Sequence, residues 1–129
     1  MAYNKLTSEE AQILLQKGTE YPHTGEYNKV SAEGTFICRQ CNTPLYRTDA
    51  KFDSGCGWPS FDDDLGDNVR RVPDRDGRRV EIICGHCNGH LGHVFSGERF
   101  TQKNTRHCVN SLSIRFITNG ADLPEVLNP

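Results

Sequence analysis

The stretch TFICRQCNTPLYRT, residues 35–48, is the part of the sequence that decides the fold. Its two ends, Thr35–Cys38 and Leu45–Thr48, are rich in β-branched and aromatic residues, which favour β-strands. Between them, Cys38 and Cys41 form a CxxC motif, whose tight turn points two sulfurs at one ion. The stretch therefore predicts two short strands joined by a metal-binding turn.

A second CxxC motif, Cys84 and Cys87, follows another expected strand, Arg79–Cys84. Four thiolates complete a tetrahedral site with no position left for a substrate, so we expect one structural zinc ion per chain. Residues 42–83 separate the two motifs, so the ion would connect two distant hairpins. Such a link replaces hydrophobic core that a small β domain lacks.

Other uses of these motifs stay open. The pairs could be redox-active or form disulfides, although a thioredoxin-like CxxC accompanies a βαβ unit, for which there is no pattern here. His90 and His93 continue the three-residue spacing of Cys84 and Cys87, so either could replace a thiolate ligand. A zinc deaminase is excluded, because there is no His-x-Glu motif and no proline precedes either CxxC.

The rest of the chain predicts a mainly β fold. Residues 7–17 predict a helix with a Thr7–Glu10 capping box, a stop at Gly18 and an apolar face. That face consists of Ala11, Ile13, Leu14 and Leu15. Further strands are expected at 69–72, 93–96 and 108–117, with a hairpin turn at 74–77. No strand alternates with a long helix, so we expect a small antiparallel β-barrel or two packed sheets with an N-terminal helix.

The composition excludes several classes of protein. With 129 residues, 35% of them hydrophobic, the chain has the length of one domain, residues 1–129. Its apolar runs are too short to span a membrane, and a net charge of -2 with interspersed signs argues against nucleic-acid binding. Residues 1–6 show no secretion signal. We therefore expect a cytoplasmic protein whose six cysteines serve metal ligation and catalysis.

Two cysteines belong to neither CxxC motif. Period-2 alternation puts Cys108 between Arg106 and Asn110 on one face of the strand expected at 108–117, on which Leu112, Ile114 and Phe116 follow. This predicts a polar group at the mouth of the barrel, where Arg106 favours the nucleophilic thiolate of Cys108. The alternative is that each unpaired cysteine is a small buried hydrophobe.

The second unpaired cysteine, Cys56, lies in a loop between two glycines. The glycines allow the backbone movement that a second thiol would need to close a disulfide. Trp58 nearby is either core or a flat wall for an apolar ligand. His90 and His93, flanked by glycines, are either structural or suited to acid–base chemistry.

Five blocks of the sequence resemble the type B methionine sulfoxide reductases, which reduce the R epimer of methionine sulfoxide in proteins. The resemblance runs from about residue 6 to residue 117. The blocks are the two CxxC motifs, KFDSGCGWPSF (51–61), GHLGHVF (89–95) and RHCVNS (106–111).

The resemblance implies a mechanism and partners. Cys108 would attack the sulfoxide sulfur and become a sulfenic acid, and Cys56 would then form a disulfide with it that thioredoxin reduces. His90, His93, Arg106 and Asn110 would orient and protonate the sulfoxide oxygen. Trp58 would pack on the substrate methyl group. The implied role is repair of oxidised proteins during oxidative stress.

A second hypothesis is a zinc-knuckle module that binds protein or nucleic acid. It explains the four paired cysteines but leaves Cys56, Cys108 and Trp58 without a purpose. Such a module would show a basic, aromatic-rich surface, and the nearly neutral charge argues against one.

Overall fold

The computed structural model describes residues 2–21, 24–28, 32–74 and 77–128. One α-helix in this part of the chain, α1 (Ser8–Leu14), precedes a series of antiparallel strands and short 3₁₀ turns. The strands are β1 (Gly34–Cys38), β2 (Pro44–Arg47), β3 (Lys51–Phe52), β4 (Ser60–Phe61), β5 (Val69–Pro73), β6 (Val80–Cys84), β7 (His90–Ser96), β8 (Thr105–Val109) and β9 (Ile114–Thr118). The 3₁₀ turns are η1 (Thr48–Ala50), η2 (Gly66–Asn68) and η3 (Ser111–Ser113).

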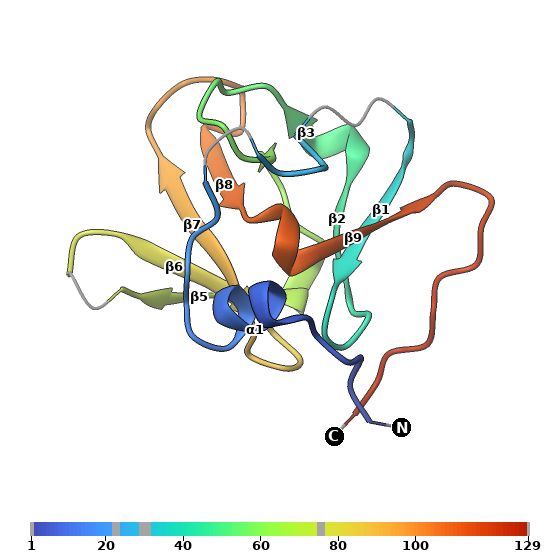
Figure 1. Cartoon of the computed structure of the whole chain (residues 1–129). Coiled ribbons are helices and arrows are strands. Elements are labelled where there is room, and N and C mark those ends of the chain that lie inside the picture. Colours follow the sequence, from blue (N-terminus) through green and yellow to red (C-terminus); the bar gives the residue numbers. More distant parts are fainter. Residues whose placement is uncertain (1, 22–23, 29–31, 75–76, 129) are drawn as a thin grey trace.

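The strands form two sheets, one ordered β2-β1-β9 and the other β3-β4-β8-β7-β6-β5 (Figure 1). Aromatic side chains from both sheets meet in the core between them. Phe61 of the larger sheet stacks on Tyr46 at 4.3 Å between ring centroids and meets Phe36 edge-on at 5.2 Å. All three side chains are fully buried. The prediction of a mainly β fold with two packed sheets and an N-terminal helix is confirmed.

Helix α1 begins as the sequence predicts and ends earlier. The Thr7 Oγ1 accepts from the Glu10 amide, and the Glu10 carboxylate accepts from the Thr7 amide, so the capping box is present. The helix ends at Leu14 rather than at residue 17, because Lys17 adopts a left-handed φ of 58°. Leu14 packs into the core, whereas Leu15 is 58% exposed, so its assignment to the apolar face was wrong.

The strand predicted at 108–117 is two strands in different sheets. β8 ends at Val109 in the six-stranded sheet, η3 turns the chain, and β9 starts at Ile114 in the three-stranded sheet. The interruption arises at residues 110–113, where Asn110, Ser111 and Ser113 have short polar side chains that favour turns. The Ser113 hydroxyl, for example, donates to the His90 carbonyl at 2.8 Å. The single face shared by Cys108 and the residues from Leu112 to Phe116 therefore does not exist.

Two hairpins of the larger sheet determine where the site lies. β5 and β6 pair from Val69↔Cys84 to Pro73↔Val80, which confirms the expected hairpin; Arg75 and Asp76 of its turn lie outside the described residues. β7 is longer than predicted, since it begins at His90, and it approaches β8 closely. A Cβ atom at Gly92 would lie 1.9 Å from the Cys108 carbonyl oxygen, so only glycine fits there.

Within the described residues, no helix has the length and apolar character needed to cross a membrane.

Candidate functional site

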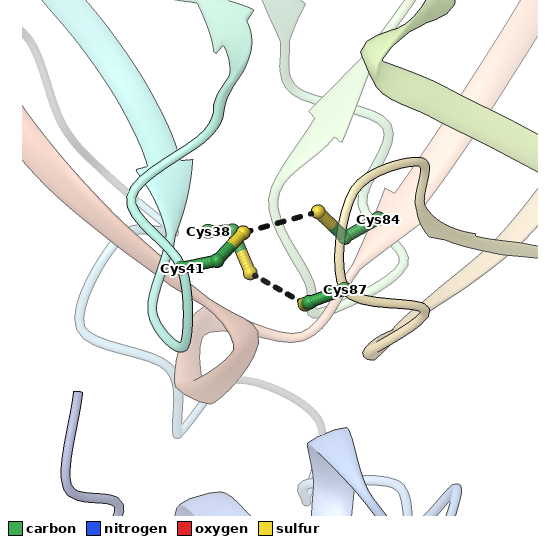
Figure 2. Close-up of side chains that lie close together, drawn as sticks. All are labelled: Cys38, Cys41, Cys84 and Cys87. Atoms are coloured by element: carbon green, nitrogen blue, oxygen red, sulfur yellow. Dashed lines mark hydrogen bonds between the residues drawn. The ribbon is translucent and has the colours of Figure 1, made fainter. Parts of the chain in front are cut away.

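The four cysteines of the CxxC motifs converge at one end of the two sheets (Figure 2). Cys38 ends β1 and Cys84 ends β6, so each sheet contributes one pair. The two turns are built alike. In each turn, the backbone N–H of an asparagine with positive φ, Asn42 or Asn88, donates to the carbonyl of the first cysteine at 2.9 Å. Asparagine tolerates this conformation better than most residues, so both turns point their sulfurs inward.

The sulfur positions fit a tetrahedral metal ion. All four Sγ atoms lie within 4.8 Å of one another, and the Cys38–Cys87 and Cys41–Cys84 pairs lie at 3.6 and 3.5 Å. Zn–S bonds of 2.3 Å imply sulfur separations of about 3.8 Å in a tetrahedron. Hydrogen bonding between the first two thiols raises the pKa of Cys38 and lowers that of Cys41. Four thiolates this close repel one another unless a cation lies between them, so the cluster could hold a metal ion.

The two unpaired cysteines meet in a separate place. Cys108 lies in β8, opposite Ser60 of β4 and His93 of β7. Its Sγ is 3.5 Å from that of Cys56, in the loop between β3 and β4. This loop turns at Gly55 and Gly57, whose φ angles of 74° and 91° few other residues adopt. Since a disulfide is about 2.05 Å long, only a small movement would bond the two sulfurs.

A pocket of about 150 Å³ opens at this thiol pair. The structure brings together here most residues that the sequence singled out: Cys56, Trp58, His93, Arg106, Cys108 and Asn110. His90 does not line the pocket; it is buried, with its ring centroid 5.7 Å from that of His93. Sequence reasoning missed four other lining residues, which are Thr19, Arg79, Gly92 and Phe95.

The thiol pair shares one proton. The hydrogen bond from Cys108 lowers the pKa of Cys56 to about 4, and the same bond together with burial raises the pKa of Cys108. Arg106 lowers the pKa of Cys108, as the sequence predicted, but its effect is weaker than those two. Either sulfur can donate across this 3.5 Å contact, so the thiolate can lie on Cys56 or on Cys108.

Arg106 is held at the rim by two contacts. Its Nε and Nη2 atoms donate to the Glu98 carboxylate at 2.7 and 3.1 Å. Its guanidinium carbon lies 4.5 Å from the centre of the Phe95 ring. A two-pronged ion pair and a ring beneath the guanidinium restrict its orientation, so its donors have a defined direction.

His90 and His93 are each paired with a carboxylate. His90 Nδ1 lies 2.7 Å from Glu81, which also accepts from Lys17 at 2.8 Å, and burial lowers the pKa of His90. His93 Nε2 lies 2.6 Å from Asp74. Such pairs fix the ring orientation and leave the other nitrogen for chemistry. The His90 Nε2 atom has no hydrogen-bond partner among the described residues.

The histidines are not part of the cysteine cluster. Among the described residues, the group suited to a metal consists of the four cysteines alone. His90 and His93 face carboxylates on the β5–β6 hairpin instead, so the alternative of histidine ligands finds no support. The sequence signal for Glu81 was a charged residue at the start of an apolar run, Glu81–Cys84.

Asn110 and Trp58 are both anchored to one peptide segment. The Asn110 amide donates to the Leu91 carbonyl at 3.0 Å and accepts from the Glu20 backbone N–H at 2.9 Å. The Trp58 indole donates to the Glu20 carbonyl at 3.1 Å. The segment that follows α1 therefore reaches the pocket, where Thr19 is part of the lining.

Comparison with known proteins identifies the class. The SelR domain matches residues 6–118, so this is a SelR-domain protein. The chain is 58% identical, over 86% of its length and 82% of the relative's, to peptide methionine sulfoxide reductase B5 of Oryza sativa subsp. japonica. The chain belongs to the family of type B peptide methionine sulfoxide reductases.

Two other relatives are longer. The chain is 60% identical over 86% of its length to the chloroplastic peptide methionine sulfoxide reductase B2 of Arabidopsis thaliana, and 55% identical over 91% to the chloroplastic B3 protein of Oryza sativa subsp. japonica. It spans 55% and 52% of those proteins, about half their length.

Among solved structures, the Mis18 'Yippee-like' domain matches with a TM-score of 0.52 at 17% identity. The match covers 69% of this chain and 99% of that one. At this identity the likeness concerns the fold alone.

Proposed function

We propose that the protein reduces methionine-R-sulfoxide, free or in proteins, to methionine and so repairs oxidised proteins. The observation that carries the proposal is the 3.5 Å approach of Cys56 and Cys108 at a pocket walled by Trp58 and supplied with His93, Arg106 and Asn110. Membership of the sulfoxide reductase family supports the same conclusion. A buried thiol without a function would need neither the pocket nor its donors.

The reaction divides into three steps in which the two thiols differ. The Cys108 thiolate attacks the sulfoxide sulfur, the oxygen takes up a proton, and methionine leaves while Cys108 becomes a sulfenic acid. The Cys56 thiol then attacks that sulfenic acid, which forms the Cys56–Cys108 disulfide and releases water. Thioredoxin supplies two electrons by thiol–disulfide exchange and restores both thiols.

The surrounding groups serve the first step. A sulfoxide sulfur is a poor electrophile until its oxygen is hydrogen-bonded or protonated, so donors must lie beside the thiolate. We assign that task to His90, His93, Arg106 and Asn110, with His93 supported as the nearer histidine because it lines the pocket. The Trp58 ring gives the substrate methyl group an apolar wall.

We further propose that Cys38, Cys41, Cys84 and Cys87 hold one structural zinc ion per chain. The short sulfur separations and the inward direction of both turns support this assignment. The ion would supply a tetrahedral link between the two sheets and no chemistry at the pocket. The cytoplasm is the proposed location, although two relatives are named chloroplastic.

A stereospecific assay tests the activity. The R and S sulfoxides of an N-blocked methionine are each incubated with the protein and dithiothreitol, and the methionine formed is measured. We expect the R epimer to be reduced and the S epimer to remain, because a chiral sulfoxide presents its oxygen and methyl group to only one arrangement of donors and wall. Reduction of the S epimer alone, or of neither, would show that the proposal is wrong.

A further inference from the structure

The 3₁₀ turn η3 lacks the cap that its sequence provides. Asn110 is the N-cap residue of η3 and would ordinarily accept from the free amides of the turn. It makes no such bond. Its side chain instead bridges the Leu91 carbonyl and the Glu20 backbone N–H, at the wall of the pocket. The free amides of η3 therefore need another acceptor.

Glu20 supplies that acceptor from a distant part of the sequence. Its Oε1 atom accepts from the Leu112 amide at 3.0 Å. The side chain is only 7% exposed. Gly25 leaves the space for it, since a Cβ atom there would lie 2.4 Å from Glu20 Oε2 and 2.3 Å from Ser111 Oγ. A charged acceptor that is buried and closely fitted fixes its own backbone firmly.

The backbone of Glu20 contacts two residues that line the pocket. Its N–H donates to Asn110 at 2.9 Å, and its carbonyl accepts from the Trp58 indole at 3.1 Å. The Glu20 side chain itself does not line the pocket. Whatever holds Glu20 in place therefore holds both Asn110 and Trp58.

We propose that Glu20 is a positioning residue for the sulfoxide reaction. Its carboxylate caps η3 in place of Asn110, which leaves the Asn110 amide to the pocket, and its backbone seats Asn110 and Trp58 at a defined separation. This rests on the proposed function, because positioning has meaning only for the reaction that takes place in the pocket.

The test uses tryptophan fluorescence together with kinetics. Trp58 is the only tryptophan in the chain, so its emission reports the bond to the Glu20 carbonyl without any turnover. In Glu20→Ala we expect the emission maximum to move toward that of a water-exposed indole. The KM for the R-sulfoxide should rise about tenfold, because Asn110 and Trp58 lose their fixed positions beside the substrate. Glu20→Gln keeps an acceptor oxygen and should recover most of both values.

Two further variants complete the design. Glu9→Ala removes an exposed carboxylate from the first turn of α1 and should change neither emission nor KM. Gly25→Ala keeps Glu20 but places a methyl group against its carboxylate, so it should shift the emission in the same direction as Glu20→Ala. If Glu20→Ala fails to fold, Gly25→Ala replaces it as the perturbed variant, and its emission and KM are compared with those of Glu20→Gln.

The outcomes separate this inference from the proposed function. Unchanged emission and KM in Glu20→Ala and Gly25→Ala would overturn the inference, as would an emission change with wild-type KM. A wild-type protein that reduces neither sulfoxide would count against the proposed function. A shift in emission would then still establish that Glu20 seats Trp58.

Discussion

The cysteine cluster and the thiol pair place sulfur atoms at almost the same separation, 3.5 to 3.6 Å, yet differ in every other respect. In the cluster, two tight turns from different sheets aim four sulfurs at one point, and three of the four cysteines are fully buried. In the pair, one sulfur comes from strand β8 and the other from a glycine loop, and both face a pocket. Whether cysteines suit metal binding or catalysis depends on how many sulfurs converge and on whether a substrate can reach them. The distance between the sulfurs does not decide it.

The two regions also differ in how they avoid repulsion between negatively charged thiolates. Four adjacent thiolates need a cation, whereas two thiols can share a proton. The hydrogen bond between the two thiols lowers the pKa of Cys56, which favours a thiolate in the pair. A metal ion would hold the cluster still, and a mobile proton leaves the pair reactive. The first three of the following experiments should each affect one region and spare the other.

The largest effect is expected from loss of a cluster thiolate. Purified protein should contain about one equivalent of zinc, and Cys84→Ser should lose it, because a structural site contributes a binding free energy on the order of 10 kcal/mol. Metal analysis and the melting temperature measure this. Cys56→Ser is the matched control and should keep its metal. Full metal content with unchanged stability in Cys84→Ser would contradict the assignment.

Exchange of the pocket thiols should produce two different failures. Cys108→Ser should form no methionine, because a hydroxyl of ordinary pKa cannot replace a thiolate. Cys56→Ser should still form about one methionine per enzyme in a single turnover, since attack precedes the step that it blocks. Quenched single turnovers followed by mass spectrometry should detect a sulfenic acid on Cys108.

Equal yields from these two serine variants would remove the distinction between attacking and resolving thiol. A methionine equivalent from Cys108→Ser with none from Cys56→Ser would reverse the roles. Both variants should retain zinc, because neither residue lies in the cluster.

Histidine variants test whether His90 and His93 belong to the pocket or to the cysteine cluster. His93→Ala and His90→Ala should each lower the rate of sulfoxide reduction by about a hundredfold and leave zinc bound. The effect of His93→Ala should be at least as large, because His93 lines the pocket and His90 lies behind it. His86→Ala, in the turn between Cys84 and Cys87, is the control and should keep the wild-type rate. Loss of zinc in His90→Ala would instead place that histidine in the cluster.

The smallest effect concerns His107, which precedes Cys108 but faces the core. Burial lowers the pKa of His107 to about 4, and its Nδ1 lies 2.8 Å from the Tyr46 hydroxyl. The unfolded chain, with a histidine pKa near 6.5, binds more protons between pH 6.5 and 4. The free energy of unfolding should therefore fall as pH drops through this window, by up to about 3 kcal/mol from this residue.

His107→Gln removes that titration while it keeps a partner for Tyr46. Urea unfolding from pH 7 to pH 4 should show a flatter acid limb for His107→Gln than for the wild type. Identical slopes in the two proteins would contradict the lowered pKa of His107.

Local patterns predicted what local forces determine. The capping box of α1, the CxxC turns and the strands beside them each depend on neighbours a few residues away. The break between β8 and β9 could not be predicted in this way. The sequence around Asn110 and Ser113 predicts a strand, because the turn there depends on distant partners, Glu20 and His90. Strands β3 and β4 escaped prediction because two residues carry no periodicity.

The site shows the same division. The motifs and the family resemblance led to the four cluster cysteines and to most of the pocket lining. Missing were the carboxylates that hold the functional groups, namely Glu20, Asp74, Glu81 and Glu98. Acidic residues are usually solvated, so apart from the position of Glu81 at the start of an apolar run, nothing in the sequence distinguishes these four from the other acidic residues of the chain. Glu20 bonds to a residue 90 positions away, a contact that only the fold creates.

The cluster takes one pair of sulfurs from each sheet. An ion bound there would therefore couple the packing of the two sheets to a metal-binding equilibrium. With an ion bound, the folded protein gains stability by mass action, about 1.4 kcal/mol for each tenfold rise in free metal above the dissociation constant. Two cells with the same amount of this chain but different free zinc would then contain different amounts of folded protein. If the cluster binds zinc, the amount of folded scaffold that carries the thiol pair would depend on the metal content of its surroundings.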